Sequence, residues 1–302
     1  MIAAIVVLYY PAQPMIERLL SSLMEQVDGV FLIDNTPGSA SGEPPFLEGF
    51  GKPVSYVALG ENRGIAEAQN IGIKLSIEGG YSYVLLLDQD SALVQGTVSK
   101  MLAAEKGLLE SGARIAAICP RIFDRRSGAR PAAVRYTFGL VRKISGNGLG
   151  DQPIATENFI ASGSLLRVDA LKKIGLMLED LFIEHVDTEW AFRAQSMGYQ
   201  SYCAANAILE HDFGDDTLRI LGKDIYLYSV LRYQYKLRNE AYLLRVKTMG
   251  WGWRLYASTR IFYHLMLYTM TSRNQRGAFV SLLRAIGNGL RGRLGKINTS
   301  ND

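Results

Sequence analysis

The sequence predicts an α/β fold in which a mostly parallel sheet has helices on both faces, followed by a helical extension at the C-terminus. Short, continuously apolar runs recur through the first 120 residues, as expected of strands that are buried on both faces. Segments with the apolar spacing of helices alternate with these runs, and that alternation is typical of parallel sheets. After Phe213 the pattern becomes helical and stays so to the end of the chain.

The predicted strands are residues 2–8, 29–33, 54–59, 83–87 and 115–119, and the predicted helices are 15–24, 66–77 and a segment that ends near residue 110. Residues 37–53 are rich in Gly, Pro and Ser and are predicted to form a loop. The segment 123–158 has no clear period, and residues 125–131 within it indicate an exposed loop. An interrupted strand at 159–168, a helix at 186–197 and a short strand at 199–204 follow. These patterns predict a domain at 1–216 and a basic, aromatic-rich helical region at 217–302.

The composition is that of a globular protein with a large core, because 48% of the 302 residues are apolar and 21% are charged. The two cysteines, Cys119 and Cys203, are far apart and form neither a disulfide framework nor a zinc-site spacing, which fits a reducing compartment. Residues 1–8 are apolar but lack the basic segment and the cleavage site of a signal peptide. We therefore expect a cytoplasmic protein.

The net charge of +4 hides an asymmetry between the two parts of the chain. Residues 217–302 contain 15 Lys or Arg and 3 Asp or Glu, a net charge of +12, whereas residues 1–216 carry −8. Basic charge beside aromatic residues favours an anionic partner, and we expect peripheral binding to the inner face of the cytoplasmic membrane. Residues 251–270 predict a surface-lying amphipathic helix, since no apolar run approaches the roughly 20 residues of a membrane span. A helical extension without a surface partner and a homodimer interface are the alternatives, and no nucleic-acid module is recognised.

Polar side chains follow several of the predicted strands at the points where those strands end. They are Tyr9, Asp34, Asn62 and Asp88. Ligands of parallel sheets bind outside the carboxyl ends of the strands, and this set is large enough to hold a nucleotide. Asp34, followed by Asn35, carries a carboxylate that could accept a hydrogen bond from a pyrimidine N–H, with a simple turn as the alternative.

Two carboxylates, Asp88 and Asp90, flank Gln89 immediately after the apolar strand 83–87. Hard divalent cations prefer oxygen ligands, and Mg²⁺ is commonly held by one or two carboxylates together with substrate phosphates. The pair therefore predicts a site for Mg²⁺ or Mn²⁺ that also contacts a diphosphate. The alternative is an Asx turn that caps the next helix.

A loop containing Asn62, Arg63 and Gly64 opens the helix that continues through Asn70. Backbone N–H groups at the start of a helix suit an anion, and Arg63 adds positive charge. The alternative is an ordinary helix start capped by Asn62.

Residues 182–193 contain four titratable acidic or histidine side chains within six positions. Glu189 and Arg193 are four positions apart on a predicted helix and are expected to pair. One carboxylate at the helix start is then free to act as a general base, unless the segment is simply an acidic helix start that the helix dipole stabilises. His211 follows a short strand, where a histidine is either structural or a metal ligand.

The order of these segments resembles the inverting family 2 glycosyltransferases with the GT-A fold, over roughly residues 2–215. The matching stretches, in the family order, are Val6–Pro11, Asp34-Asn35, Asn62–Gly72 and Asp88–Ser91. Ser162–Ser164, Phe182–Arg193 and Arg232–Asn239 are particularly similar to the bacterial rhamnosyltransferase branch. The resemblance implies a metal-dependent transferase of cell-surface polysaccharide synthesis. Its implied donor is dTDP-β-L-rhamnose, and its implied acceptor is a saccharide or a polyprenyl-linked saccharide.

The resemblance also implies roles for individual residues. Asp34 would contact the base, Asp88 the ribose or the metal, Asp90 the metal, and Asp187 would be the catalytic base. His211 would be a further metal or diphosphate contact. The other residues implied to bind donor or acceptor are Tyr9, Asn35, Asn62, Arg63, Asn70, Gly163, Glu184 and Trp190. The chain departs from the family at Tyr10, where Asn is usual, and at Val186-Asp187, where Glu-Asp is common.

Other classes of protein are less consistent with the residues. No Gly-x-Ser-x-Gly elbow, P-loop or complete Gly-x-Gly-x-x-Gly is present, which argues against covalent hydrolysis, P-loop ATP chemistry and Rossmann dehydrogenases. A nucleotidyltransferase would usually carry a Gly-rich basic loop where this chain has Tyr9–Ala12. A non-catalytic sugar-nucleotide-binding protein would keep Asp34 and Asp88 but would not need Asp187.

Overall fold

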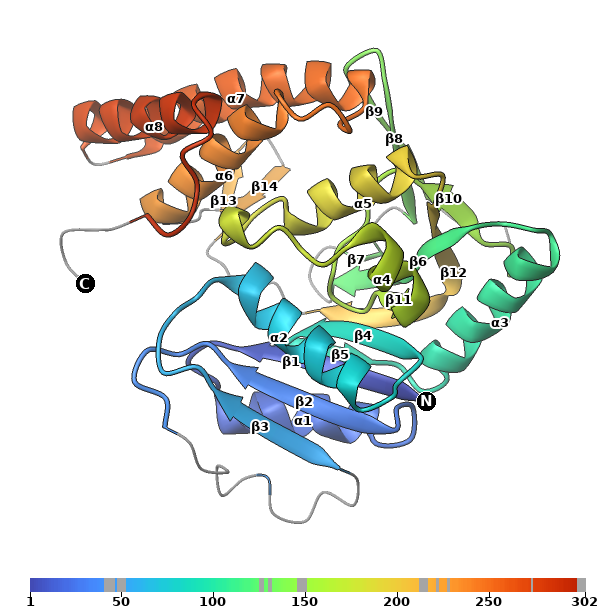
Figure 1. Cartoon of the computed structure of the whole chain (residues 1–302). Helices are drawn as coiled ribbons and strands as arrows, with labels where there is room; N and C mark the ends of the chain where they lie inside the picture. Colours follow the sequence, from blue (N-terminus) through green and yellow to red (C-terminus); the bar gives the residue numbers. More distant parts are fainter. Residues whose placement is uncertain are drawn as a thin grey trace.

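A mixed sheet forms the centre of the protein in the computed structural model (Figure 1). The structure describes residues 1–40, 47, 53–124, 128–129, 132–145, 151–211, 217–220, 223–226, 229–272 and 274–297. The order of the main strands is β10-β12-β6-β11-β4-β1-β2-β3. The predicted α/β class is confirmed.

The N-terminal half of the sheet is parallel. Strand β1 (Ile2–Leu8) lies between β2 (Gly29–Asp34) and β4 (Tyr83–Asp88), and β3 (Val54–Ala58) pairs with the far side of β2. All seven residues of β1 are buried, as its continuous apolar run predicts. Because the four strands run in the same direction, their carboxyl ends meet at one edge of the sheet.

Helices cover both faces of this sheet, as predicted. Helices α1 (Gln13–Leu23) and α3 (Thr97–Glu110) pack on one face, and α2 (Ile65–Glu78), α4 (Val168–Ile174) and α5 (Val186–Ser196) pack on the other. The alternation of side chains along β1 divides the core accordingly. Val6 and Leu8 belong to the cluster with α1 and α3, whereas Ile5 and Val7 belong to the cluster with α2, α4 and α5.

The C-terminal half of the sheet contains antiparallel strands. Strand β11 (Leu165–Arg167) is antiparallel to both β4 and β6 (Ile115–Asp124), and β12 (Gln200–His211) runs parallel to β6. The short strands β5 (Ser91–Leu93) and β10 (Ile154–Thr156) pair antiparallel with β12, and β7 (Gly128–Ala129) pairs antiparallel with β6. Only three residues of the predicted strand 159–168 are therefore extended in the sheet.

Two hairpins differ from the sequence-based expectation. Strands β8 (Ala133–Thr137) and β9 (Leu140–Ile144) lie in the segment that showed no period, and β13 (Thr217–Ile220) and β14 (Lys223–Tyr226) lie where a continuous helical pattern was predicted. Each is a two-stranded sheet of its own, so its residues need not alternate between core and solvent. Of the predicted loops, 41–46, 48–52, 125–127 and 130–131 lie outside the described residues.

Three helices form the C-terminal region: α6 (Val230–Leu243), α7 (Trp251–Thr271) and α8 (Gln275–Leu290). They pack against one another beside α5 (Figure 1), around a small core of Tyr233, Leu237, Leu265, Tyr268 and Leu282. Within the described part of the chain, every helix is too short or too polar to cross a bilayer.

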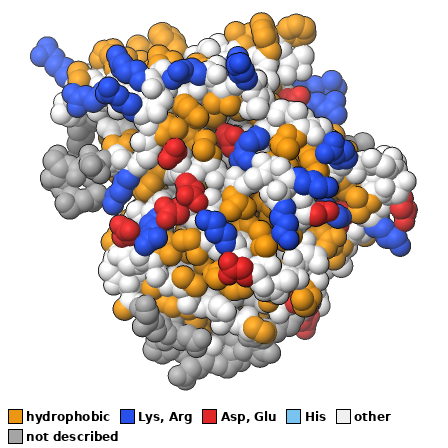
Figure 2. Space-filling view, in the orientation of Figure 1, with side chains coloured by type: hydrophobic (Ala, Val, Ile, Leu, Met, Phe, Trp, Pro, Cys, Tyr) orange, Lys and Arg blue, Asp and Glu red, His pale blue; other side chains and the backbone are white. Residues whose placement is uncertain are grey.

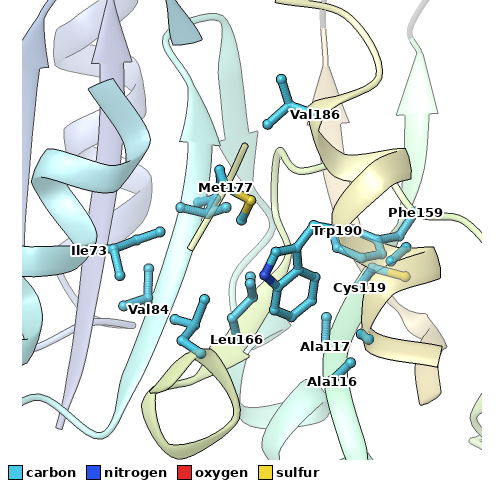
Figure 3. Close-up of a cluster of buried hydrophobic side chains, with 14 of the residues drawn as sticks. Ile73, Val84, Ala116, Ala117, Cys119, Phe159, Leu166, Met177, Val186 and Trp190 are labelled. Atoms are coloured by element: carbon cyan, nitrogen blue, oxygen red, sulfur yellow. The ribbon is translucent and has the colours of Figure 1, made fainter. Parts of the chain in front are cut away.

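Trp190 is the largest fully buried side chain and joins α5 to the sheet (Figure 3). Its indole packs edge-on against Phe159, with ring centroids 6.1 Å apart, and its Nε1–H donates to the carbonyl oxygen of Gly175 at 2.8 Å. Leu166, Ala116 and Ala117 lie on the sheet side of the ring in Figure 3. The orientation of α5 therefore depends on a ring that both fills the core and satisfies a backbone carbonyl.

We predict that Trp190→Phe lowers the free energy of unfolding by about 2–3 kcal/mol, because the variant leaves a cavity and an unpaired carbonyl. The matched control is Trp251→Phe, whose ring in α7 is 68% exposed. Its unfolding free energy should change by no more than about 0.5 kcal/mol. Urea unfolding followed by circular dichroism measures both, and equal stability of the two variants would contradict this account of the core.

Candidate active site

Polar residues from three neighbouring strands meet at the carboxyl edge of the parallel sheet. Asp34 ends β2 beside Leu8, and Asp88 ends β4 beside Val7. Tyr9 and Tyr10 directly follow β1 and are 45% and 64% exposed. Tyr9, Asp34 and Asp88, which the sequence placed at strand ends, therefore lie at one edge.

The turn that contains Asp88 and Asp90 is held on both sides. The backbone N–H of Tyr9 donates to Gln89 Oε1 at 2.8 Å, and Gln89 Nε2 donates to the Tyr9 carbonyl oxygen at 3.1 Å. The backbone N–H of Asp88 donates to Ser162 Oγ at 3.0 Å. Gln89 thus ties the turn to β1, and the two flanking carboxylates are half-buried at the sheet edge.

Asp88 and Asp90 offer the oxygen ligands that a divalent cation prefers. The third predicted ligand, His211, is brought near them by its backbone, because His211 pairs with Ser91 in the β12–β5 ladder. Among the side chains that the structure describes, no three His, Cys, Asp or Glu gather into a complete metal site. Mg²⁺ or Mn²⁺ held here would fill its remaining positions with water or phosphate oxygens, as Mg²⁺ usually does.

Asp34 lies deep at the sheet edge and is 5% exposed. Its carboxylate accepts hydrogen bonds from the Thr36 N–H at 2.9 Å and from the Tyr56 hydroxyl at 2.5 Å. Burial and the bond to Asp34 both raise the pKa of Tyr56, so the phenol remains a donor. The carboxylate is therefore positioned by the protein itself. A nucleotide base that contacts it could donate only to the lone pairs that these two bonds leave.

The loop before α2 is tied together by two asparagines. Asn35 Nδ2 donates to Asn62 Oδ1 at 3.1 Å, the N–H of Arg63 donates to Asn35 Oδ1 at 2.8 Å, and the N–H of Gly64 donates to Asn62 Oδ1 at 3.0 Å. Gly64 has φ +84°, and a Cβ there would lie 2.6 Å from the carbonyl oxygen of Phe182. The glycine is therefore required by both backbone conformation and space.

Most N–H groups at the start of α2 are used within the fold. The N–H groups of Ile65 and Ala66 donate to the carbonyl oxygen of Phe182, at 2.7 and 3.4 Å. The Arg63 guanidinium lies 3.3 Å from Glu61 and 3.4 Å from Glu67. Few backbone donors are therefore left for a ligand here, and an anion at this helix start stays a prediction.

Three residues that the resemblance suggested as ligand contacts have structural roles instead. Asn70 is 1% exposed, and its amide bonds to the backbone of Met177 and to Glu179. Trp190 is fully buried in the core. Gly163 is buried with φ +82°, and its N–H donates to the Leu86 carbonyl oxygen at 2.7 Å. Each of these groups is occupied by the protein, which leaves none of them exposed to a ligand.

Asp187 lies in the first turn of α5 and contacts Ala161. The next residue, Ser162, contacts the backbone of Asp88. Its Oδ2 accepts from the N–H of Ala161 at 3.3 Å, and its Oδ1 accepts from the N–H of Thr188 at 2.7 Å. Ala161 is followed by Ser162, whose hydroxyl accepts from the N–H of Asp88. Burial raises the pKa of Asp187, although His185 and the two N–H bonds oppose the shift. A raised pKa suits a group that must take up a proton near neutral pH.

The other two acidic residues of this segment are paired with cations. Glu189 and Arg193 form two bonds of 2.9 Å, which confirms the predicted pair. Glu184 lies 2.7 Å from Arg232 and 3.9 Å from Lys236 of α6. Burial opposes ionisation of Glu184, but Lys236 and Arg232 lower its pKa overall. Glu184 is therefore an ionised member of an interhelical network.

The segment before α5 has an unusual backbone that sequence patterns did not reveal. Phe182, Glu184 and His185 have φ of +66°, +63° and +64°. Asn239 of α6 holds this backbone, because its Nδ2 lies 2.9, 2.7 and 2.9 Å from the carbonyl oxygens of Leu181, Ile183 and Glu184. Asn239 occurs in a stretch similar to rhamnosyltransferases, and that similarity was the one sequence signal of its importance.

Comparisons with known proteins identify relatives of this chain. Residues 4–175 match the family described as glycosyl transferase family 2. The dTDP-rhamnosyl transferase RfbF of Shigella flexneri is 32% identical over 246 residues, which are 81% of this chain and 80% of the relative.

Solved structures of low sequence identity share the fold. TarS of S. aureus aligns with a TM-score of 0.61 and 12% identity, and its residues 1–349 with UDP-GlcNAc align with a TM-score of 0.59 and 12% identity. Both alignments cover 96% of this chain, with 49% and 82% of the respective TarS chains. GalNAc-T7 with UDP, GalNAc and Mn²⁺ aligns with a TM-score of 0.56 and 12% identity, over 91% of this chain and 58% of that one.

These structural likenesses show the GT-A fold alone, and the chain spans only about half of TarS and 58% of GalNAc-T7. The assignment to a family is based on the sequence matches. Because the family match covers more than half of the chain and a 32% identical relative covers 81% of it, the chain belongs to glycosyltransferase family 2.

Proposed function

We propose that the chain transfers L-rhamnose from dTDP-β-L-rhamnose to a saccharide or polyprenyl-linked saccharide, with inversion and with the help of Mg²⁺ or Mn²⁺. The observation that carries the chemistry is that the Asp88 backbone and the Asp187 carboxylate contact the neighbouring residues Ser162 and Ala161, with Asp90 two positions after Asp88. The choice of donor is supported by the resemblance to a relative described as a dTDP-rhamnosyl transferase. The proposed setting is cell-surface polysaccharide synthesis at the inner face of the cytoplasmic membrane.

The proposed reaction is a single displacement. The acceptor hydroxyl loses its proton to the Asp187 carboxylate while its oxygen forms a bond to the anomeric carbon. The bond from that carbon to the diphosphate oxygen breaks at the same time, so the anomeric configuration inverts. Asp88 and Asp90 would hold the divalent cation, whose charge offsets the negative charge of the departing nucleoside diphosphate.

A nucleotidyltransferase or a non-catalytic binding protein would use the same strand-end carboxylates. Neither would need a half-buried carboxylate with a raised pKa beside residues 161–162. Asp187 therefore distinguishes the proposed transferase from both alternatives.

We predict that Asp90→Ala abolishes the dependence of nucleotide binding on metal, because the cation loses a carboxylate and the diphosphate loses its bridge. Calorimetric titration of dTDP with Mn²⁺ or with EDTA measures this dependence. Glu110→Ala is the control, since it removes the same charge at the end of α3, before the amino end of β6. Equally tight, Mn²⁺-dependent binding in wild type and Asp90→Ala would contradict the metal role.

We predict that Asp187→Asn lowers turnover by about 10²-fold or more with little change in dTDP affinity, because the amide keeps the shape but cannot accept the proton. Release of dTDP from dTDP-β-L-rhamnose in the presence of a lipid extract measures turnover. In the wild type, activity should fall on acidification at a pH above the usual range of an Asp carboxyl, because burial raises this pKa. Near-normal turnover in Asp187→Asn, with a loss in Glu184→Gln, would move the base to Glu184.

An exposed apolar stripe with flanking basic residues supports the proposed membrane association. On α7 the stripe consists of Trp251, Leu255, Phe262, Met266 and Met270, and α8 adds Phe279, Leu283 and Leu290. The exposed arginines of α8 and the turn after it are Arg276, Arg284, Arg291 and Arg293. Figure 2 shows apolar and basic side chains together at the end of the molecule where these helices lie. Apolar burial combined with cationic charge is the usual basis of binding to an anionic lipid surface.

We predict that the protein sediments with anionic vesicles at low salt but not with neutral ones, and that binding weakens as salt screens the charges. The double variant Arg276→Glu/Arg284→Glu should bind less, since each cation near the surface contributes about 1 kcal/mol. Lys100→Glu/Lys106→Glu, on the exposed face of α3, is the matched control. A dimer that persists without lipid, together with no sedimentation, would instead make these helices an interface between two copies.

A further inference from the structure

A cavity of about 130 Å³ lies beside Asp187, between α5, β8 and the C-terminal helices. Thr188, which follows Asp187, lines it, and the Thr188 hydroxyl is 3.3 Å from Asp187 Oδ1. Tyr136 of β8 also lines it, and the charge of Asp187 helps to raise the pKa of that phenol. The cavity is therefore next to the proposed base and does not include Asp88 or Asp90.

Aromatic rings form much of the wall of this cavity. Tyr136 and Tyr256 have ring centroids 5.3 Å apart, and Trp253 packs edge-on against His185 at 6.1 Å. The face of an aromatic ring carries negative charge, so it attracts the C–H groups on the apolar face of a sugar ring. Such a wall, with a few polar groups, is the usual composition of a small-molecule site.

One oxygen of a buried carboxylate that lines the cavity has no hydrogen bond within the described part of the chain. Glu240 of α6 is 2% exposed, with Oε1 3.3 Å from His185 Nε2 and Oε2 3.9 Å from His264 Nδ1. Glu240 Oε2 has no hydrogen-bond partner among the described residues. Burial disfavours the charged form, but the two histidines lower the pKa of Glu240 overall. The two histidines leave the carboxylate incompletely hydrogen-bonded, and because Glu240 lines the cavity, a ligand hydroxyl there could donate to it.

The charges around the cavity nearly balance. Lys236 and Arg260 are cations, but Lys236 lies 3.9 Å from Glu184, and Arg260 donates to the Tyr256 hydroxyl at 2.8 Å. Glu240 places a negative charge inside the cavity. A phosphate or uronate would be repelled by that carboxylate, whereas neutral hydroxyl groups can donate to it.

We propose that this cavity binds the terminal neutral pyranose of the acceptor, with a sugar hydroxyl donating to Glu240 and the ring resting on Tyr256 and Trp253. This inference rests on the proposed function, because the sugar bound here would present its reacting hydroxyl to Asp187. It gives the C-terminal helices a direct part in acceptor choice. Glu240, Trp253 and Tyr256 then become determinants of specificity.

Saturation-transfer NMR on the full chain tests the proposal. The probes are methyl glycosides of glucose, galactose, N-acetylglucosamine and rhamnose, with methyl glucuronide as the charged comparison, each measured with dTDP and Mn²⁺ present. We expect transfer to at least one neutral glycoside and none to the glucuronide. Glu240→Gln and Tyr256→Leu should each weaken that binding by about tenfold, as expected for one hydrogen bond or one packing surface. Tyr263→Leu, 51% exposed on the same helix, is the control and should bind as the wild type does.

Titration of dTDP on each preparation shows that the variant is folded and separates this inference from the proposed function. Normal dTDP binding without binding of any neutral glycoside by the wild type would overturn the inference. Unchanged glycoside binding in both Glu240→Gln and Tyr256→Leu would overturn it as well. If the wild type binds a glycoside but no dTDP, and the two variants lose the glycoside, the result would support a sugar site in the cavity. It would contradict the proposed donor.

Discussion

The candidate active site depends on one buried amide, the side chain of Asn239. It is fully buried and lies within hydrogen-bond distance of three carbonyl oxygens in the segment before α5. Left-handed conformations at Phe182, Glu184 and His185 each cost on the order of 1 kcal/mol or more, so this backbone needs an external hold. The same backbone is joined to two helices. The Phe182 carbonyl oxygen accepts from the first N–H of α2, and α5, whose second residue is Asp187, begins directly after His185. One side chain of α6 therefore supports the start of α2, the start of α5 and the proposed base.

The parallel half of the fold could be predicted because its physical signals are local. Ile2–Leu8 is apolar throughout, and a strand buried on both faces requires that. Asp34 and Asp88 follow such strands, and parallel pairing alone brings them to one edge. The β8–β9 and β13–β14 ladders were missed since neither is part of the main sheet, and a separate two-stranded ladder imposes little pattern on its residues.

The roles of single polar residues could not be predicted, because their partners are remote in sequence. Asn70 bonds to Met177, and nothing near position 70 distinguishes an amide that holds the backbone from one that holds a ligand. Glu189 was assigned correctly since its partner Arg193 is one helical turn away. Glu240 has no partner close in sequence. It lies in α6, whereas His185 precedes α5 and His264 lies in α7.

The connection from Arg238 to Gly295 has a consequence for how the protein is made. Arg238 donates to the carbonyl oxygens of Leu181 and Gly295, and the N–H of Gly295 donates to the carbonyl oxygen of Asp180. When a ribosome has reached Ser196, the strands that carry Asp34 and Asp88 can already pair, but Asn239 and Gly295 have not been synthesised. In the nascent chain, the sheet edge with Asp34 and Asp88 can thus form early. The segment that carries the proposed base, Asp187, gains its support late. A polypeptide released before α6 would retain the former and lack Asn239, which supports the latter.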